Sequence, residues 1–546
     1  MRRRKMSATS AAPSAPAAAA VDALVEALQL LDLSADALGH VLFRLPDAED
    51  IARAAPACKA FSAAAKHATK LRADALPFPL PLTELSVVPT PGQPLHNNEP
   101  TLRAVRWAEA ALRSAHTIAG CNFQSHVIGC AGTLYTWGGD GDGGRDMGHI
   151  APIGVGERRE PTLRPEEIVD PPAFRGLRSV VAHVSNSVCV DHDGNVWCWG
   201  ENFYGQLGQL DMQPQWRPVK IGAEPSIPES MPRILQVAAG NQFFVLLTAK
   251  GEVRSFGFNM HGQLGLGHSH RGIWTHPLHF PPVTGFDGRR VVEISAGNYH
   301  CAVVDEVGGL WTWGVEDKGR LGLGGIGYSH DGVRNRPCRV MLLSRERIVH
   351  ANAGSEHTLA VTEKGEVYGF GANQYGQLGV GDFRDKALPT LVTTFHEARE
   401  QSTGRLIDRV EPTPRVKQVS AGETHSVFLT ETGEVYTMGG AELDGDGTVG
   451  MLGHGPTGEL ASTACQRPRK VIWACHGDPS LGGVPIKALE VKASSFHTLV
   501  RMHDSVVYSC GRGTDGMLGH GDETDRWHLT KILALPVDPA MVEDRA

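Results

Sequence analysis

The chain has 546 residues, a formal net charge of −8 at pH 7 and 64 glycines, and 41% of its residues are hydrophobic. This length is too great for one ordinary compact domain, although a closed array of repeats can reach it as a single unit. The mildly acidic balance argues against nucleic acid as a partner, and no apolar run approaches the ~18 residues of a membrane-spanning helix.

Cysteine and histidine usage points away from metal or redox chemistry. The 10 cysteines form no CxxC pair and no zinc spacing, and the 25 histidines form no HExxH cluster. Cys189, Cys198 and Cys301 fall within strand-like stretches, which predicts reduced, buried thiols in a cytosolic or nuclear protein. No Ser/His/Asp order or carboxylate pair stands out. We therefore expect no catalytic residues, no metal site and no cofactor.

The first segment, residues 1–28, opens with MRRRKMSATSAAPSAPAAAA, which holds four basic residues and no acidic one. We interpret it as a disordered, basic and alanine-rich tail. An organelle transit segment and a short basic nuclear signal are the alternatives. The expected location is the cytoplasm, the nucleus or both, and organelle targeting by residues 1–20 stays open.

Residues 29–75 carry an apolar stripe at helical spacing, with Ser34 and Asp47 as N-caps of successive short helices. This pattern resembles an F-box, a motif that docks on the Skp-type adaptor of cullin-RING ubiquitin ligases. It departs from that family where Ser34 replaces the usual Pro and where Phe61 stands in place of Trp, and an unrelated helical cap is the alternative. The resemblance implies that six residues contact the adaptor as a helix in a groove, namely Leu33, Leu38, Val41, Leu42, Leu45 and Ile51.

Two further segments show neither this stripe nor the repeat that follows. Residues 76–115 include PFPLPLTELSVVPTPGQP and are predicted to be a proline-rich connector. Residues 537–546 are predicted to be a C-terminal tail.

A glycine-rich sequence motif recurs seven times between the connector and the C-terminal tail. Clear copies are WCWGENFYGQLG (197–208), FGFNMHGQLGLG (256–267), WGVEDKGRLGLG (313–324) and FGANQYGQLGVG (370–381), and looser ones begin at residues 137, 438 and 510. Three successive intervals between the marker glycines, from Gly200 to Gly371, are 57 residues each. A phosphate-binding loop is needed once, before a helix, so seven even copies predict a repeat architecture instead.

Each repeat has the pattern of a four-stranded sheet. In residues 349–379, two alternating strands flank Lys364-Gly365, which predicts a two-residue turn with a positive φ at glycine. A glycine-rich corner follows, in which Leu378 and its equivalents are predicted to fill the core, and then an outer strand such as RPCRV (336–340). One such sheet cannot bury both its faces alone, whereas a ring of them can. The tryptophans before the corners are expected to pack between sheets, at Trp197, Trp199, Trp311 and Trp313.

These motifs resemble the regulator of chromosome condensation repeat. Its AGxxH strand stands here as AGNYH (296–300), AGSEHT (353–358) and AGETHS (421–426), in fixed order with the GxVYxWG strand and the GQLGxG corner. The resemblance implies an all-β, seven-bladed β-propeller over residues 116–536, preceded by the small α-helical F-box-like domain. The segment DRWHLTKILALP (525–536) is predicted to close the ring by pairing with the first blade.

A propeller presents a broad, rigid face of loops, so we predict a non-enzymatic scaffold that binds other proteins. The histidines His300, His357, His425 and His497 share one repeat position and are predicted to form hydrogen bonds within each blade. Together with an F-box, the layout implies the substrate receptor of a Skp–cullin–F-box ubiquitin ligase. Such a receptor holds an unidentified protein substrate near the ubiquitin donor and contributes proximity.

The alternative function is guanine-nucleotide exchange on a Ran-like small GTPase, the activity of the founding member of the repeat family. Gly439 and Gly453 stand 14 positions apart, whereas Gly200 and Gly208 stand 8 apart, so the sixth corner is enlarged. The resemblance implies that Glu423 replaces an aspartate needed for exchange. It also implies a wedge at the nucleotide, formed by Asp444, Asp446, Thr448 and Val449. A tolerated loop insertion is the other interpretation of this corner.

Overall fold

The computed structural model describes residues within 116–535, which belong to one compact unit, Ser114–Ala546. The described ranges are 116–129, 132–139, 154–155, 161–209, 212–222, 231–269, 280–325, 332–396, 412–440, 450–455, 465–471, 487–503, 505–533 and 535. The predicted tail, F-box-like domain and connector lie outside them, and so do the six predicted adaptor contacts, Leu33, Leu38, Val41, Leu42, Leu45 and Ile51.

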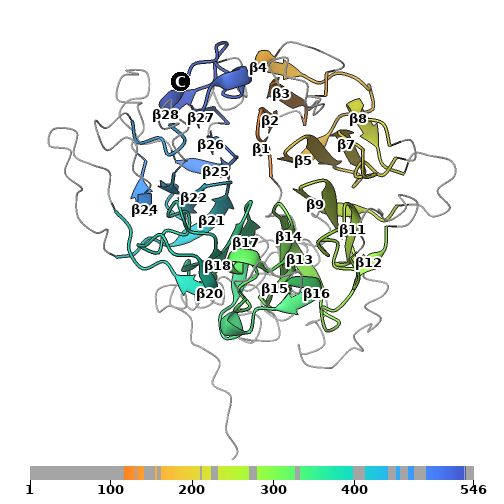
Figure 1. Cartoon of the computed structure of the whole chain (residues 1–546). Coiled ribbons are helices and arrows are strands. Elements are labelled where there is room, and N and C mark those ends of the chain that lie inside the picture. The colour runs from red at the N-terminus through yellow and green to blue at the C-terminus, as the bar shows by residue number, and fades with distance from the viewer. Residues whose placement is uncertain are drawn as a thin grey trace, which may run out of the picture. The chain divides into compact units, whose positions relative to one another are not determined.

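Within these ranges the chain forms seven four-stranded antiparallel sheets, set around a centre like the blades of a propeller (Figure 1). The sequence prediction of a seven-bladed, all-β propeller is therefore confirmed. Each blade is built from four strands that follow one another along the chain, with the first strand innermost. The only helices among the described residues are three single 3-10 turns, η3 (Asp317–Gly319), η4 (Met341–Leu343) and η8 (Thr514–Gly516).

The strands of blades 1 to 4 are β1 (Ile118–Gly120), β2 (Gln124–Ile128), β3 (Leu134–Gly138) and β4 (Thr162–Glu167); β5 (Leu177–His183), β6 (Asn186–Asp191), β7 (Val196–Gly200) and β8 (Gln215–Lys220); β9 (Ile234–Gly240), β10 (Phe243–Thr248), β11 (Val253–Gly257) and β12 (Pro282–Val283); and β13 (Val291–Ala296), β14 (His300–Asp305), β15 (Leu310–Val315) and β16 (Val333–Arg339). Those of blades 5 to 7 are β17 (Ile348–Ala353), β18 (His357–Thr362), β19 (Val367–Gly371) and β20 (Lys386–Leu391); β21 (Val416–Ala421), β22 (His425–Thr430), β23 (Val435–Gly439) and β24 (Cys465–Lys470); and β25 (Ala488–Ala493), β26 (His497–Met502), β27 (Val507–Gly511) and β28 (Arg526–Lys531).

The burial of the strands explains their residue types. In blade 5, β18 is buried at all six positions because blades cover both of its faces, whereas the outer strand β20 is buried at none. A strand covered on both faces takes apolar and β-branched residues at successive positions, and HTLAVT has this composition. The outer strand is half exposed, which accommodates the proline and charged residues of KALPTL.

The hairpin turn of each blade is longer than predicted. Thr362 N–H donates to the Glu366 carbonyl at 2.9 Å and Gly365 N–H donates to the Thr362 carbonyl at 2.8 Å, which leaves a loop of three residues. Gly365 has a φ of +79°, so the turn is a three-residue loop that ends in a left-handed glycine. The positive φ was predicted correctly, but the two-residue length was not.

The core lies between neighbouring blades, as the corner leucines and tryptophans predicted. Leu207, from the corner of blade 2, packs with Cys198 of its own blade and with Phe244 and Phe256 of blade 3. The equivalent Leu264, Leu321 and Leu378 are fully buried as well, and so are Trp199 and Trp313. Because each corner fills the gap to the next blade, the sheets are held as a ring and not as separate units.

The ring closes without an exchanged strand, which corrects one prediction. The C-terminal strand β28 pairs with β27 of its own blade, and blade 1 supplies its own outer strand β4. Blades 7 and 1 are instead joined by hydrogen bonds of side chains. The Ser125 hydroxyl and the Trp137 indole donate to the Met517 carbonyl at 2.9 and 2.8 Å. Arg501 donates to the Thr117 hydroxyl at 2.8 Å and to the Ile128 carbonyl at 3.0 Å.

Candidate interaction face

Antiparallel pairing places two kinds of loop at the same edge of every blade. In blade 4 the turn between β13 and β14 (297–299) and the segment between β15 and β16 (316–332) leave the sheet at one edge, and the hairpin turn (306–309) leaves it at the other. We call the edge with the AGxxH turns and glycine-rich corners the corner face. Repetition around the ring makes it a continuous rim of loops.

The glycine of the AGxxH turn is required by a close approach between blades. A Cβ on Gly297 would lie 2.0 Å from the Gly354 carbonyl oxygen, and one on Gly354 would lie 2.6 Å from the Gly422 carbonyl oxygen. Neither contact is possible for a real side chain, so the inner ends of blades 4 to 6 can meet only through glycine.

The repeated histidines join neighbouring blades, not strands of one blade as predicted. Their Nε2 atoms lie at hydrogen-bond distance from a hydroxyl of the next blade, in the pairs His300–Thr358 (2.9 Å), His357–Ser426 (2.9 Å), His425–Thr498 (3.0 Å) and His497–Ser125 (2.8 Å). His126, two positions further along β2 than the repeat position, makes a bond of the same kind with Ser187 (2.9 Å). In blade 5 the Thr358 hydroxyl donates in turn to the Arg320 carbonyl at 2.8 Å, so Nε2 of His300 must carry the proton. These histidines are therefore part of the ring's structure.

Burial keeps these imidazoles neutral. It lowers the pKa of His126, His357, His425 and His497 to about 3. A ring with so low a pKa, whose Nε2 proton is held by the next blade, cannot exchange protons with a substrate near neutral pH. The prediction that this position is structural agrees with the geometry.

Glu423 lies on the corner face, in the turn between β21 and β22 of blade 6. It is partly buried, and burial raises the pKa of its carboxyl; a hydrogen bond with Ser495 acts against this rise and the charge of Glu356 adds to it. The Ser495 hydroxyl also lies 2.5 Å from Oδ1 of Asn122, across the seam between blades 7 and 1. Glu423 therefore lies close to Ser495 of blade 7, which in turn contacts Asn122 of blade 1.

The enlarged corner of blade 6 is anchored on the same face. After β23 ends at Gly439, the chain returns where the Thr498 hydroxyl donates to the Met451 carbonyl at 2.7 Å and the Thr437 hydroxyl donates to the Leu452 carbonyl at 2.7 Å. The predicted wedge residues Asp444, Asp446, Thr448 and Val449 lie outside the described residues. The segment that contains them begins and ends on the face that carries Glu423.

An arc of aromatic side chains crosses the corner face from blade 2 to blade 4, a feature that the sequence analysis missed. Ring centroids are 4.8 Å apart for Tyr204–Phe258, 6.1 Å for Phe258–His261 and 4.9 Å for His261–Tyr299. The signal was present in the sequence, since Tyr204 and His261 hold the same place before GQLG. Their neighbours Phe203 and Met260 are 50% and 40% exposed. Exposed apolar side chains beside aromatic rings in edge-to-face contact are typical of protein-binding surfaces.

A charged group lies beside the arc, between blades 4 and 5. Arg320 Nη2 is 3.2 Å from Glu356 Oε1 and 3.4 Å from Asp317 Oδ2, and Lys318 also pairs with Glu356. Burial raises the pKa of Glu356, but its bonds with Lys318 and Arg320 outweigh burial and lower it overall. The corner face thus combines an apolar arc, a paired charged group and Glu423.

Metal and membrane features were checked over the same ranges. Among the residues that the structure describes, no three His, Cys, Asp or Glu side chains gather as ligands for a metal ion. In that part of the chain no helix is long and apolar enough to cross a membrane.

Comparisons with known proteins agree with this architecture. The model of the regulator of chromosome condensation (RCC1) repeat matches residues 193–247, 250–304, 307–361 and 364–429. The ultraviolet-B receptor UVR8 of Arabidopsis thaliana is 31% identical over 363 residues, which cover 66% of this chain and 71% of that protein. The secretion-regulating guanine nucleotide exchange factor of Mus musculus is 29% identical over 430 residues, covering 76% of this chain and 82% of that protein.

A solved structure shares the fold. Prp20p of Saccharomyces cerevisiae superimposes with a TM-score of 0.56 at 22% identity, over 74% of this chain and 87% of that one. Repeat matches, relatives and blade geometry agree, and the chain belongs to the family of proteins built from the regulator of chromosome condensation (RCC1) repeat.

Proposed function

We propose that the protein binds a partner protein through its corner face and acts as a guanine-nucleotide exchange factor for a Ran-like small GTPase. The observation that carries this proposal is the position of Glu423, a carboxylate held between blades 6 and 7 on the face from which the enlarged sixth corner departs. Two similar proteins add support. The mouse relative is called an exchange factor, and Prp20p is described as binding Gsp1p and histones.

The geometry suits the task of exchange. A factor accelerates nucleotide release if it binds the nucleotide-free GTPase more tightly than the loaded one, and the coupling between the two ligands is reciprocal. A rigid carboxylate at the interface can supply this preference, because its charge repels the phosphates of a bound nucleotide in a site from which water is excluded. Glu423 is partly buried on the corner face, close to Ser495. The aromatic arc would supply the apolar part of the contact.

The test is the rate of GDP release from a Ran-like GTPase in the presence of the full chain. We expect acceleration by the wild type and a loss of roughly 10- to 100-fold in Glu423→Ala, the scale of one lost charge-assisted hydrogen bond. Glu431→Ala is the matched control, because Glu431 belongs to the same blade but lies at the opposite edge, paired with Arg415 on the surface. Failure of the wild-type chain to accelerate release would disprove the proposal.

A second candidate function rests on the apolar stripe of residues 33–51. We propose as the alternative that this segment binds a Skp-type adaptor and a cullin complex, so that the corner face holds an unidentified protein substrate. The full chain should then co-purify with the adaptor. Leu42→Asp should abolish co-purification, and Arg44→Asp, predicted to lie off the stripe, should not. Equal recovery of the adaptor with both variants would exclude a stripe-mediated contact.

A further inference from the structure

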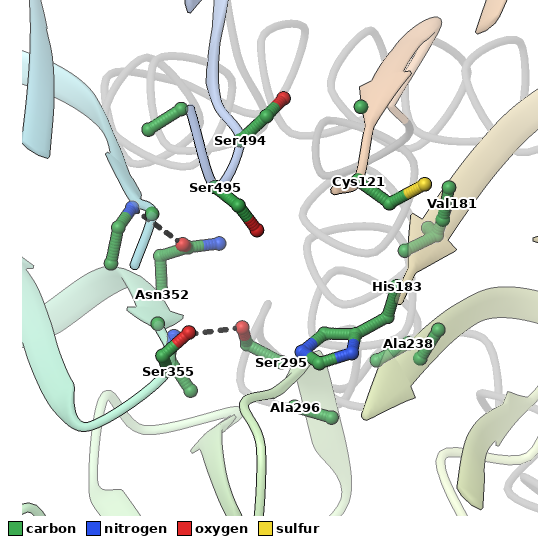
Figure 2. Close-up of a pocket in the computed structure, with 18 of the residues that line it drawn as sticks. Cys121, Val181, His183, Ala238, Ser295, Ala296, Asn352, Ser355, Ser494 and Ser495 are labelled. Carbon is green, nitrogen blue, oxygen red and sulfur yellow. Dashed lines mark hydrogen bonds between the residues drawn. The ribbon is translucent and has the colours of Figure 1, made fainter. Parts of the chain in front are cut away.

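The seven blades surround a central channel that no predicted role uses. It encloses a cavity of about 300 Å³, lined by the inner strands of all seven blades and by the AGxxH turns on the corner face (Figure 2). Cavities that hold small molecules begin at about this size. The channel is therefore large enough for one small ligand.

The channel carries polar side chains from several blades. At the innermost turn position, blades 3 to 6 carry glycine, whereas blades 1 and 2 carry Cys121 and His183. Both of these side chains line the cavity, and the ring of His183 faces it in Figure 2. Two residues deeper, blade 7 contributes Lys492 and blade 5 contributes Asn352.

Lys492 lines the cavity and is partly buried. It makes no hydrogen bond or ion pair with any described residue, although burial lowers its pKa and only the nearby Glu490 and Cys121 oppose this. Glu490 is engaged elsewhere, since its carboxylate accepts from Thr117 N–H at 3.0 Å and from the Thr117 hydroxyl. The Lys492 ammonium can therefore donate to acceptor groups inside the cavity, such as the oxygens of a bound anion.

Two further donors face the same space. Oδ1 of Asn352 accepts from Ala421 N–H at 2.8 Å, which fixes the amide and directs its NH₂ group toward the middle of the cavity, as Figure 2 shows. The ring of His183 faces the cavity; its Nδ1 is buried and has no partner among the described residues, which leaves Nε2 as the nitrogen that can donate to a ligand. Burial, and to a smaller extent the charge of Lys492, lowers the pKa of His183 to about 4, so the ring is neutral near pH 7.

We propose that the channel binds a small oxyanion, a carboxylate or a phosphate group, held by Lys492, Asn352 and His183. Lys492 offers only donors, Asn352 has only its NH₂ group free, and neutral His183 supplies one N–H, so the complementary ligand presents acceptor oxygens and a negative charge. Glu423 also lines the cavity, but it belongs to the turn at the corner-face end, whereas Lys492 and Asn352 lie on the inner strands that lead to these turns.

The experiment titrates the full chain with inorganic phosphate and, separately, with succinate, by isothermal titration calorimetry at fixed ionic strength. We expect saturable binding of one anion per chain. Lys492→Met should weaken it by roughly 10- to 100-fold, because it removes one charge-assisted hydrogen bond. Asn352→Asp should weaken it similarly, since Asp keeps the acceptor for Ala421 N–H and replaces the NH₂ donor with a carboxylate oxygen.

Lys531→Met is the matched control, because Lys531 lies exposed on the outer strand of the same blade. It should bind like the wild type. Saturation by phosphate alone or by succinate alone supports the site and tells which oxyanion it takes. The absence of saturable heat with both anions, or affinities in Lys492→Met and Asn352→Asp equal to the wild type, overturns the proposal. GDP release is independent of this readout, so failure of the exchange proposal leaves this one standing.

Discussion

A charged clasp that joins three blades is predicted to stabilise the ring. Nδ1 of His350 is bonded to Glu293 of blade 4, and its Nε2 lies 2.9 Å from the Val419 carbonyl of blade 6. The Glu293 carboxylate and the Val419 carbonyl are both acceptors, so the imidazole of His350 must donate from both nitrogens and is an imidazolium. Burial disfavours this charge, but Glu293 and the Val419 carbonyl outweigh burial and raise the pKa of His350 above 6.5.

Removing one partner should be costly. Glu293 is 3% exposed in the structure. In His350→Phe its carboxylate loses the imidazolium and keeps the Ala351 N–H, 3.2 Å away, as a donor. Breaking a buried ion pair in this way costs about 3–5 kcal/mol of unfolding free energy. In blade 3, Gln236 holds the same inner-strand position as Glu293 and His350, and its side chain donates to the Val292 carbonyl at 3.1 Å. A neutral glutamine therefore already fits this position, and the double variant Glu293→Gln/His350→Gln should cost less than ~1.5 kcal/mol, the scale of one neutral hydrogen bond.

Urea unfolding from pH 6 to 8.5 measures the free energy of unfolding of each variant, and urea, unlike guanidinium, does not screen the charges of His350 and Glu293. The unfolded histidine has a pKa near 6.5 and the folded one is higher, so the clasp contributes fully below about pH 6.5. Its contribution is lost as the pH rises through the folded pKa. Wild-type stability should therefore fall over this interval while that of His350→Phe stays flatter. A cost below ~1 kcal/mol for His350→Phe, or parallel pH curves, would refute a charged clasp.

Three further outcomes are expected. Burial lowers the pKa of His425 to about 3, whereas the unfolded histidine has a pKa near 6.5. The unfolded chain therefore gains a proton first as the pH falls from 6.5 toward 3, and the free energy of unfolding drops by up to ~1.4 kcal/mol per pH unit. Urea midpoints between pH 7 and 4.5 should fall less steeply in His425→Gln, and an unchanged slope would contradict this. Ser125→Ala breaks two bonds across the seam of blades 7 and 1, so it should cost about 1–3 kcal/mol in thermal melts, and more than Ser255→Ala, which loses the bond to the Leu264 carbonyl within one blade. Gly297→Ala places a Cβ 2.0 Å from a neighbouring carbonyl and should prevent correct ring packing, whereas Gly288→Ala, with a φ of +72° and no atom within 4 Å, should cost only ~1–2 kcal/mol; similar circular-dichroism melts for both would exclude the close contact.

The strands and their order could be predicted because their signals are local. The alternation in EVYGF, the glycine after Lys364 and the proline of RPCRV each report the conformation of a few neighbouring residues. Because the same pattern recurs at 57-residue intervals, each repeat supported the prediction of strands and turns made from the others. The position of Glu423 within its repeat could be predicted for the same reason, although the structure places it in the turn between β21 and β22 and not on a strand, and its closeness to Ser495 of the next blade could not be predicted.

The sequence by itself determined the number of blades, the strands of each and the residues that fill the gaps between them. Only the tertiary structure decided which blade each side chain contacts. The histidines bond to the next blade, the propeller closes through Ser125 and Trp137 without strand exchange, and Lys492, His183 and Asn352 line one cavity. The physical reason is distance along the chain: these contacts join residues separated by one blade or by nearly the whole ring, and local patterns carry no information about how closely such segments approach.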